Sequence, residues 1–199
     1  MGAGSIGPAG SERPVVPIDD THYVDVADVV DDFDEAFFGS GGLSRLGEVV
    51  QERSAARQLR EFAGERIGAP IARPHQILCI GLNYSDHAAE TGAPVPDEPI
   101  LFTKSPNTLV GTYDDVRIPR GSTKLDWEVE LGVVIGKRTS YLDSVDDARA
   151  AIAGYGSQRC QRTRLPDRAR WTVVQGQIGR NLQPSWAMAG DPGRDRRGP

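Results

Sequence analysis

The chain has 199 residues, of which 38% are hydrophobic and 26% charged, a composition typical of a globular protein in water. No apolar run reaches membrane-spanning length, the N-terminus lacks a secretory signal, and no basic-aromatic patch is present, so we expect a cytoplasmic protein without membrane or nucleic-acid partners. The net charge is −5, and the two cysteines, Cys79 and Cys160, have the spacing of neither a disulfide framework nor a metal motif.

The net charge conceals a change of composition near residue 155. Residues 1–155 contain 14 Lys+Arg and 25 Asp+Glu, a net charge of −11. Residues 156–199 contain nine Arg and three Asp but no Lys or Glu, a net charge of +6. The two parts therefore differ in charged-residue composition as much as two unrelated proteins do.

The first 66 residues are predicted to form a small N-terminal α/β domain. Short valine-rich runs between residues 14 and 30 indicate a hairpin, and the acidic start of residues 31–38 suits a helix N-terminus. Ser44 is expected to cap a second helix. Residues 64–74, rich in Gly and Pro, read as a linker. The apolar stripe predicted for the second helix comprises Leu46, Val49, Val50, Leu59 and Phe62.

Residues 67–155 are predicted to form the first part of a β-rich domain, so the overall fold class is α+β. Residues 76–81 and 100–104 read as short strands, the first of them buried. Asn83 can cap a short helix between them, and Ser144 can cap a later helix that runs to Ile152. Residues 126–136, with the sequence DWEVELGVVIG, read as a buried central strand.

Three carboxylates alternate along the central strand. Asp126, Glu128 and Glu130 share one face because successive side chains of a strand point to opposite sides. Neighbouring carboxylates repel one another unless a cation lies between them, and oxygen ligands suit Mg²⁺ or Ca²⁺. The alternative is a half-exposed strand whose solvent face is acidic.

A histidine and a glutamate are three residues apart in GLNYSDHAAE. On a helix, His87 and Glu90 would be neighbours, so the carboxylate could stabilise the charged imidazole and help it to act as a general base. The alternative is an ordinary polar pair on an exposed helix. His22 and His75 have no comparable neighbours and are read as structural or solvated.

Three motifs in a fixed order resemble the fumarylacetoacetate hydrolase family: IGLNYSDHAAETG, LFTKSPNTLVG and DWEVELGVVIG. The resemblance covers residues 67–155, and more loosely the N-terminal domain. It implies an incomplete, mixed β-roll catalytic domain, a divalent metal (Mg²⁺, or Mn²⁺ or Ca²⁺), and a homodimer in intact relatives. It also implies hydrolysis, isomerisation or decarboxylation at C–C bonds of dicarbonyl or 2-hydroxy-dienoate acids, as in aromatic catabolism, with a dicarboxylic keto or enol acid as substrate.

The resemblance also assigns roles to residues. Glu128 and Glu130 match metal ligands, whereas Asp126 matches a position that is not usually a ligand. His87 and Glu90 match the pair that activates water. Tyr84 and Lys104 lie at positions near the substrate.

The chain departs from the family after Gly154-Tyr155. The family's third metal ligand is the Asp of an Asn-Asp-Val-Ser motif, and here the sequence reads GSQRCQRTRLPDRARW. Read from the second base of each codon, residues 158–161 permit Asn-Asp-Val-Ser. In that frame Trp171-Thr172 forces Gly and Met188-Ala189 forces Trp, whatever the codons. We therefore predict a reading-frame slip between residues 155 and 157, and an off-frame, disordered tail over residues 156–199. A linker or low-complexity segment is the alternative.

Two main hypotheses remain open from the sequence. One is a metal-dependent hydrolase or isomerase of this family. The other is an inactive, truncated fragment of such an enzyme that lacks the third metal ligand, and this is the hypothesis we favour for this polypeptide. A weaker third possibility is a binding module that retains only the N-terminal half.

Overall fold

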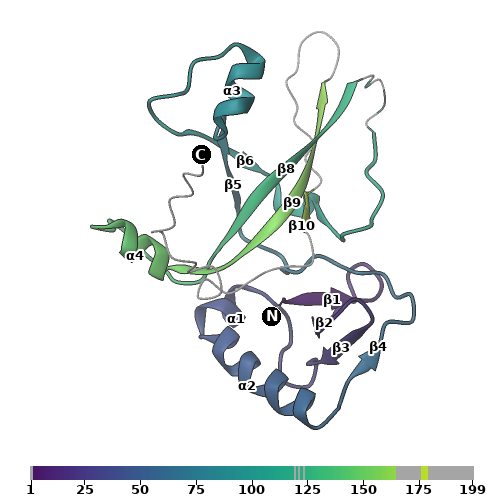
Figure 1. The fold of residues 1–199 in the computed structure, drawn as a ribbon. Coiled ribbons are helices and arrows are strands. Elements are labelled where there is room, and N and C mark those ends of the chain that lie inside the picture. The colour runs from purple at the N-terminus through teal and green to yellow at the C-terminus, as the bar shows by residue number, and fades with distance from the viewer. Residues whose placement is uncertain (1, 119, 121, 123, 165–175, 179–199) are drawn as a thin grey trace, which may run out of the picture.

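The protein consists of a lower N-terminal unit and an upper unit built around two long paired strands (Figure 1). In the computed structural model, the described residues are 2–118, 120, 122, 124–164 and 176–178. For residues 91, 124–129, 155–164 and 176–178 only the backbone is described.

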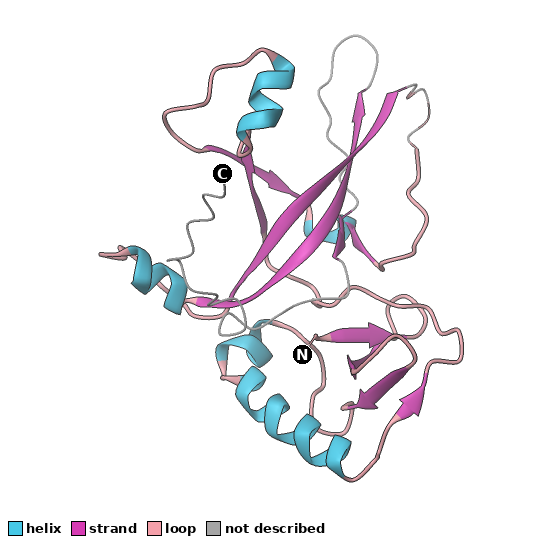
Figure 2. Cartoon of the chain, in the orientation of Figure 1, coloured by secondary structure: helices cyan, strands magenta, loops and turns pink. Residues whose placement is uncertain are grey.

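The N-terminal unit is a four-stranded antiparallel sheet with strand order β1-β2-β3-β4, accompanied by two helices (Figure 2). Its elements are β1 (Gly4–Ile6), β2 (Arg13–Pro17), β3 (His22–Asp25), α1 (Glu35–Gly39), α2 (Gly42–Ala55) and β4 (Arg60–Glu61). Val16 pairs with Val24 across β2 and β3, which confirms the hairpin predicted between residues 14 and 30.

Both helices begin at residues other than those predicted. α1 starts after Asp34, whose carboxylate accepts a hydrogen bond from the N–H of Phe37 at 3.0 Å. α2 starts after Gly41, which has φ 72°, so the predicted cap at Ser44 is wrong. A left-handed residue at this position costs little only when it is glycine.

The predicted stripe of the second helix is correct only in its first part. Leu46 and Val50 are buried against the core, and Val49 packs on it. Because α2 ends at Ala55, Leu59 and Phe62 lie beyond it. Phe62 instead packs on Tyr23, with ring centroids 4.8 Å apart.

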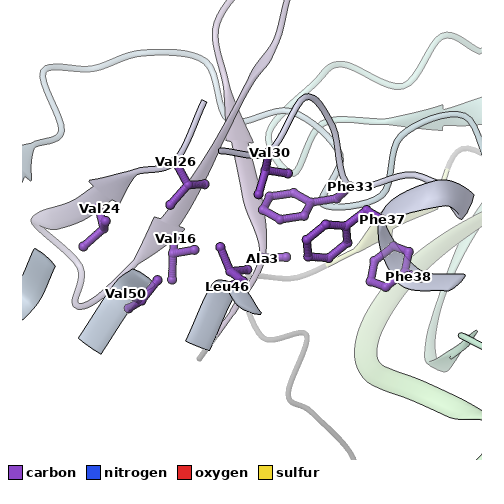
Figure 3. Packing of buried hydrophobic residues seen from close by; sticks show 10 residues of the cluster. All are labelled: Ala3, Val16, Val24, Val26, Val30, Phe33, Phe37, Phe38, Leu46 and Val50. Atoms are coloured by element: carbon purple, nitrogen blue, oxygen red, sulfur yellow. The ribbon is translucent and has the colours of Figure 1, made fainter. Parts of the chain in front are cut away.

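The main core of the protein lies in the N-terminal unit (Figure 3). Three phenylalanines form an edge-to-face chain, with centroids 5.0 Å apart for Phe33–Phe37 and 5.2 Å for Phe37–Phe38. Val134 and Ala153, from the upper unit, pack against the same cluster. The cluster comprises Ala3, Val16, Val24, Val26, Val30, Phe33, Phe37, Phe38, Leu46 and Val50.

The segment predicted to be a linker is hydrogen-bonded along the N-terminal unit. Gly68 donates to the carbonyl of Ser5 at 2.9 Å, and the Ser5 hydroxyl donates to the carbonyl of Ala69 at 2.8 Å. Ala72 donates to the carbonyl of Phe33 at 3.0 Å. These bonds hold the chain to the N-terminal unit well past residue 66. The division into domains at residue 66 stays a prediction.

The upper unit contains a two-stranded sheet, β5-β6, and a four-stranded sheet with the order β7-β10-β9-β8. Its elements are β5 (Ile77–Gly81), α3 (Ser85–Thr91), β6 (Ile100–Lys104), η1 (Pro106–Thr108), β7 (Leu109–Val110), β8 (Lys124–Ile135), α4 (Val145–Ala150), β9 (Ile152–Arg164) and β10 (Gly176–Ile178). The predicted strands over residues 76–81, 100–104 and 126–136 are confirmed as β5, β6 and β8. Ser144 caps α4 as predicted, accepting from the N–H of Asp147 at 3.1 Å.

The described part of the tail contains strands. β9 continues past residue 155 to Arg164 in antiparallel pairing with β8, and β10 pairs with β9 and β7. For residues 156–164 and 176–178 this backbone differs from the predicted disorder; the rest of the predicted tail lies outside the described residues. None of the described helices has the length and apolar character needed to cross a bilayer.

Candidate active site

The predicted His–Glu pair lies on α3, the short helix that follows β5 (Figure 1). His87 Nδ1 is 4.0 Å from Glu90 Oε2, within ion-pair range but longer than a hydrogen bond. Their side chains are 43% and 79% exposed, so solvent weakens their attraction. The pair is therefore brought together as predicted, but a hydrogen bond requires Glu90 to approach by about 1 Å.

The turn that leads into α3 is strained. Leu82 has φ 50°, a left-handed conformation that is unfavourable for a leucine. The residue preceding the helix is Tyr84, whose side chain makes no capping hydrogen bond, so the predicted cap by Asn83 is wrong. Tyr84 is 42% exposed. It thus lies one turn before His87 with its ring accessible to a ligand.

The C-terminus of α3 is closed by a glycine. Gly92 has φ 66°, and Ala93 donates to the carbonyl of Ala88 at 3.0 Å, as in a glycine-terminated helix. A seven-residue helix has little stability of its own. This cap therefore helps to fix the residues that precede it, including Glu90.

Lys104, at the end of β6, is the most buried of the predicted site residues whose side chains are described. The residue is 9% exposed, and its Nζ lies 5.9 Å from the centroid of the Phe102 ring. In the described part of the chain no carboxylate lies within ion-pair distance of it. A buried cation without a counter-charge is costly, so this position favours an anionic ligand.

The loop after Lys104 is tied to the N-terminal unit by Arg66. Arg66 donates from Nε to Asp114 Oδ1 at 2.7 Å and from Nη2 to Oδ2 at 2.6 Å, and from Nη1 to Glu12 at 2.7 Å. The N–H of Gly111 also donates to Asp114, at 2.7 Å. A Cβ at Gly111 would lie 2.3 Å from the carbonyl oxygen of Ile67, so only glycine fits this approach.

These contacts change the acidity of both carboxyl groups. The hydrogen bond from Arg66 holds the pKa of Asp114 below its ordinary value, more than offsetting burial. Burial acts to raise the pKa of Glu12, but hydrogen bonds from Arg66 and from backbone N–H groups lower it overall. The sequence gives no signal for this cluster, because Arg66 and Asp114 are 48 residues apart and no motif marks them.

The predicted metal ligands lie on β8. Glu130 is half-buried, and Glu128 is two residues away on the same strand. The side chains of Glu128 and Asp126 are outside the described part. Across the strand pair, Glu128 is opposite Cys160 and Glu130 is opposite Gln158, neither of which is a carboxylate. Among the described residues, no group of three His, Cys, Asp or Glu side chains could hold a metal.

The comparison with family models gives a match over residues 76–157 to the model described as fumarylacetoacetate (FAA) hydrolase C-terminal. This range contains α3, Lys104 and both glutamates of β8. Its last residue is Ser157, close to the point where the chain departs from the motif order.

Curated relatives are similar over part of their length. A protein of Burkholderia lata named as a hydrolase is 42% identical over 152 residues, which are 75% of this chain and 51% of that protein. Bovine mitochondrial oxaloacetate tautomerase is 49% identical over 108 residues, which are 53% of this chain and 34% of the tautomerase. The chain spans about half the length of the Burkholderia relative and about a third of the bovine one.

The fold is also similar to that of a solved enzyme. The crystal structure of maleylpyruvate hydrolase from Sphingobium sp. SYK-6, in complex with manganese(II) and pyruvate, superposes with a TM-score of 0.69 at 19% identity. The superposition covers 94% of this chain and 69% of that chain.

Proposed function

Because this chain belongs to the fumarylacetoacetate hydrolase family, we propose that it carries part of a site for hydrolysis or isomerisation of keto and enol carboxylic acids. The names of its relatives support this reaction class: a hydrolase, an oxaloacetate tautomerase and a maleylpyruvate hydrolase. A cytoplasmic location and the absence of nucleic-acid and membrane partners stay predictions from composition.

The observation that carries the proposal is the burial of Lys104. Lys104 as a whole is 9% exposed and, within the described residues, its Nζ lies 5.9 Å from the centre of the Phe102 ring with no carboxylate in reach. A substrate carboxylate would supply the missing counter-charge, and an ion pair is stronger where water is excluded. The position thus favours an organic acid as the ligand.

His87 is proposed as the general base and Glu90 as the residue that orients it. Glu90 is nearest to Nδ1, so a proton on Nδ1 would face the carboxylate and leave Nε2 to accept a proton from water or substrate. Tyr84, exposed one turn earlier, is proposed to contact the substrate.

The donor set fits a divalent metal incompletely. Glu128 and Glu130 supply two carboxylates, but their cross-strand neighbours supply none, and hard cations require six or more oxygen ligands. This observation favours a second candidate: the polypeptide by itself is an inactive fragment that binds Mg²⁺ or Mn²⁺ weakly, with a Kd of about a millimolar or more.

A calorimetric titration with Mn²⁺ distinguishes the two candidates. The fragment proposal expects weak binding, reduced further by Glu130→Gln and unchanged by Glu61→Gln, whose carboxylate is 85% exposed in the N-terminal unit. Micromolar binding that Glu130→Gln abolishes, together with turnover of oxaloacetate, would support the complete enzyme instead. If Glu130→Gln and Glu61→Gln behave alike, Glu130 is not a ligand.

A further inference from the structure

A polar pocket of about 400 Å³ lies in the N-terminal unit and shares no described lining residue with the candidate active site. It is formed by residues of β2, β3 and β4 and of the C-terminal end of α2 (Figure 1). A pocket of this size can hold a small organic ligand, and such pockets are usually lined mainly by apolar side chains. The described lining of this one is entirely charged or amide, and we name it the arginine pocket: Arg13, Asp25, Asp28, Arg53, Gln58 and Arg60.

Asp25, the last residue of β3, holds two of the arginines in place. Its carboxylate accepts a hydrogen bond from Arg13 and lies 3.1 Å from Nη1 of Arg60. The same carboxylate accepts from the N–H of Ala27 at 3.1 Å, and its side chain is 14% exposed. The side chains of Arg13 and Arg60 are 50% and 60% exposed, so part of each guanidinium is open to solvent. Two cationic groups are therefore positioned at the pocket before a ligand binds, which lowers the entropic cost of binding.

Arg53 brings a third guanidinium to the pocket from the last turn of α2. Its Nη1 donates to the carbonyl of Asp25 at 2.6 Å and to Asp28 Oδ1 at 2.8 Å. Its Nη2 donates to Asp28 Oδ2 at 2.7 Å. This forked contact fixes the plane of the guanidinium beside the end of β3. The three cations thus come from three separate elements and converge on one pocket.

The described lining carries a surplus of positive charge, with three arginines against two aspartates. Glu52 also attracts Arg53, but it is not among the described lining residues. The surplus contrasts with the surrounding unit, since residues 1–66 contain six Arg, no Lys and 13 Asp+Glu. Half of the arginines of an acidic unit are therefore gathered at one pocket, and a concave site lined by cations concentrates anions.

The number and kind of donors indicate the class of anion. Guanidinium forks match the oxygens of phosphate and carboxylate, and three of them can contact more oxygens than one carboxylate offers. The aspartates and the Gln58 amide can accept hydrogen bonds from hydroxyl groups on the rest of the ligand. We propose that the arginine pocket binds a small phosphate monoester that carries hydroxyl groups. The inference does not depend on the proposed function, because it concerns other residues in the other unit.

The test uses the full 199-residue chain and glycerol 3-phosphate as the probe, titrated by calorimetry without metal at constant ionic strength. Saturable one-to-one binding is expected. Arg60→Gln and Arg13→Gln should each weaken it by about tenfold or more, since each removes a charged hydrogen-bond donor. Arg60→Lys, which keeps the charge without the fork, should weaken it less. The matched control is Arg149→Gln, which removes an ion-paired arginine of α4 with a 68% exposed side chain and should leave binding unchanged.

A variant with the opposite expected effect separates ligand binding from a purely structural role. Asp28→Asn removes a negative charge from the pocket lining at a side chain that is 66% exposed. It should tighten the binding of glycerol 3-phosphate by roughly fivefold, because a repulsive charge close to the phosphate is lost. A cluster that only holds the fold together would bind no phosphate in this variant.

Circular dichroism verifies that each variant remains folded. The proposal is overturned if no saturable binding occurs, if Asp28→Asn weakens it, or if Arg149→Gln weakens it as much as Arg60→Gln. Equally tight binding of glycerate, which carries a carboxylate in place of the phosphate, would overturn the assignment of the ligand class. Loss of binding in Lys104→Met would also overturn the proposal, because the anion would then occupy the candidate active site.

Discussion

Replacing Lys104 by methionine should make the unliganded chain more stable. Methionine keeps an unbranched apolar side chain of similar length and removes the charge. Leaving a buried polar donor unpaired costs roughly 1–3 kcal/mol, and more when the donor is charged. The Phe102 ring offsets about 0.5 kcal/mol of this, because 5.9 Å is near the limit of a cation–π contact. We expect Lys104→Met to raise the free energy of unfolding by about 1–2 kcal/mol.

The same substitution should weaken the binding of organic acids. Pyruvate, the ligand in the maleylpyruvate hydrolase structure, is a suitable probe. At equal ionic strength it should raise the midpoint of thermal unfolding of the wild-type chain and of Lys104→Arg, which keeps the charge. Lys104→Met should show a smaller rise, corresponding to at least about a tenfold weaker affinity.

Urea unfolding followed by circular dichroism measures the stability change. Lys137→Met is the matched control, because Lys137 is exposed and its charge is already solvated. Its expected effect is within about 0.5 kcal/mol. Three results would refute the reasoning: a loss of stability in Lys104→Met, equal effects in Lys104→Met and Lys137→Met, or an unchanged response to pyruvate. Each would mean that Lys104 is not a buried cation that binds an anionic ligand.

Two further predictions concern the loop and helix that hold the site. Asp114→Asn should lower the free energy of unfolding at pH 7 by about 1–2 kcal/mol, whereas Asp115→Asn, at an exposed neighbour, should not. The folded-state pKa of Asp114 lies below its ordinary value of 3.8. The ionised carboxylate therefore stabilises the fold above pH 3.8, and this contribution is lost as the pH falls through and below that value. The free energy of unfolding of the wild-type chain should thus fall more steeply in acid than that of Asp114→Asn. Gly92→Ala should destabilise the chain by about 1 kcal/mol because of its left-handed backbone. Gly39→Ala, in the ordinary helical region with equally open space, should be neutral or stabilising, and equal effects of the two would contradict the assignment.

The sequence was informative where local chemistry decides the structure. The strands at residues 76–81 and 100–104 and the Ser144 cap depend on neighbouring residues, and they are confirmed. The cap at Ser44 failed because a left-handed Gly41 starts α2 instead, and glycine conformation cannot be read from spacing alone. The link from Arg66 to Asp114 is a tertiary contact between two units, so no local pattern announces it.

Burial was the property that sequence predicted least well. The runs in β5 and at the end of β8 are apolar enough to be buried strands, yet Leu78, Ile80 and Ile135 are exposed. Apolar periodicity indicates that a face requires a cover, but it does not say whether this chain supplies that cover. These exposed side chains all lie within residues 76–157, the range that the family model matches.

The strand register bears directly on the predicted frame slip. A third carboxylate joins the acidic face of β8 only if it stands opposite Glu128 or Glu130, at positions 160 or 158. The alternative frame puts Asn-Asp-Val-Ser at residues 158–161, so its Asp falls at position 159, opposite Val129 and on the other face. A one-residue shift of this kind moves every side chain of a strand to the opposite side. Restoring the frame alone would therefore not rebuild the metal site in this register. Either the intact gene encodes one residue more or one residue fewer before position 158, or β9 pairs with β8 one residue out of its present register. The nucleotide sequence around codon 155 distinguishes these two cases.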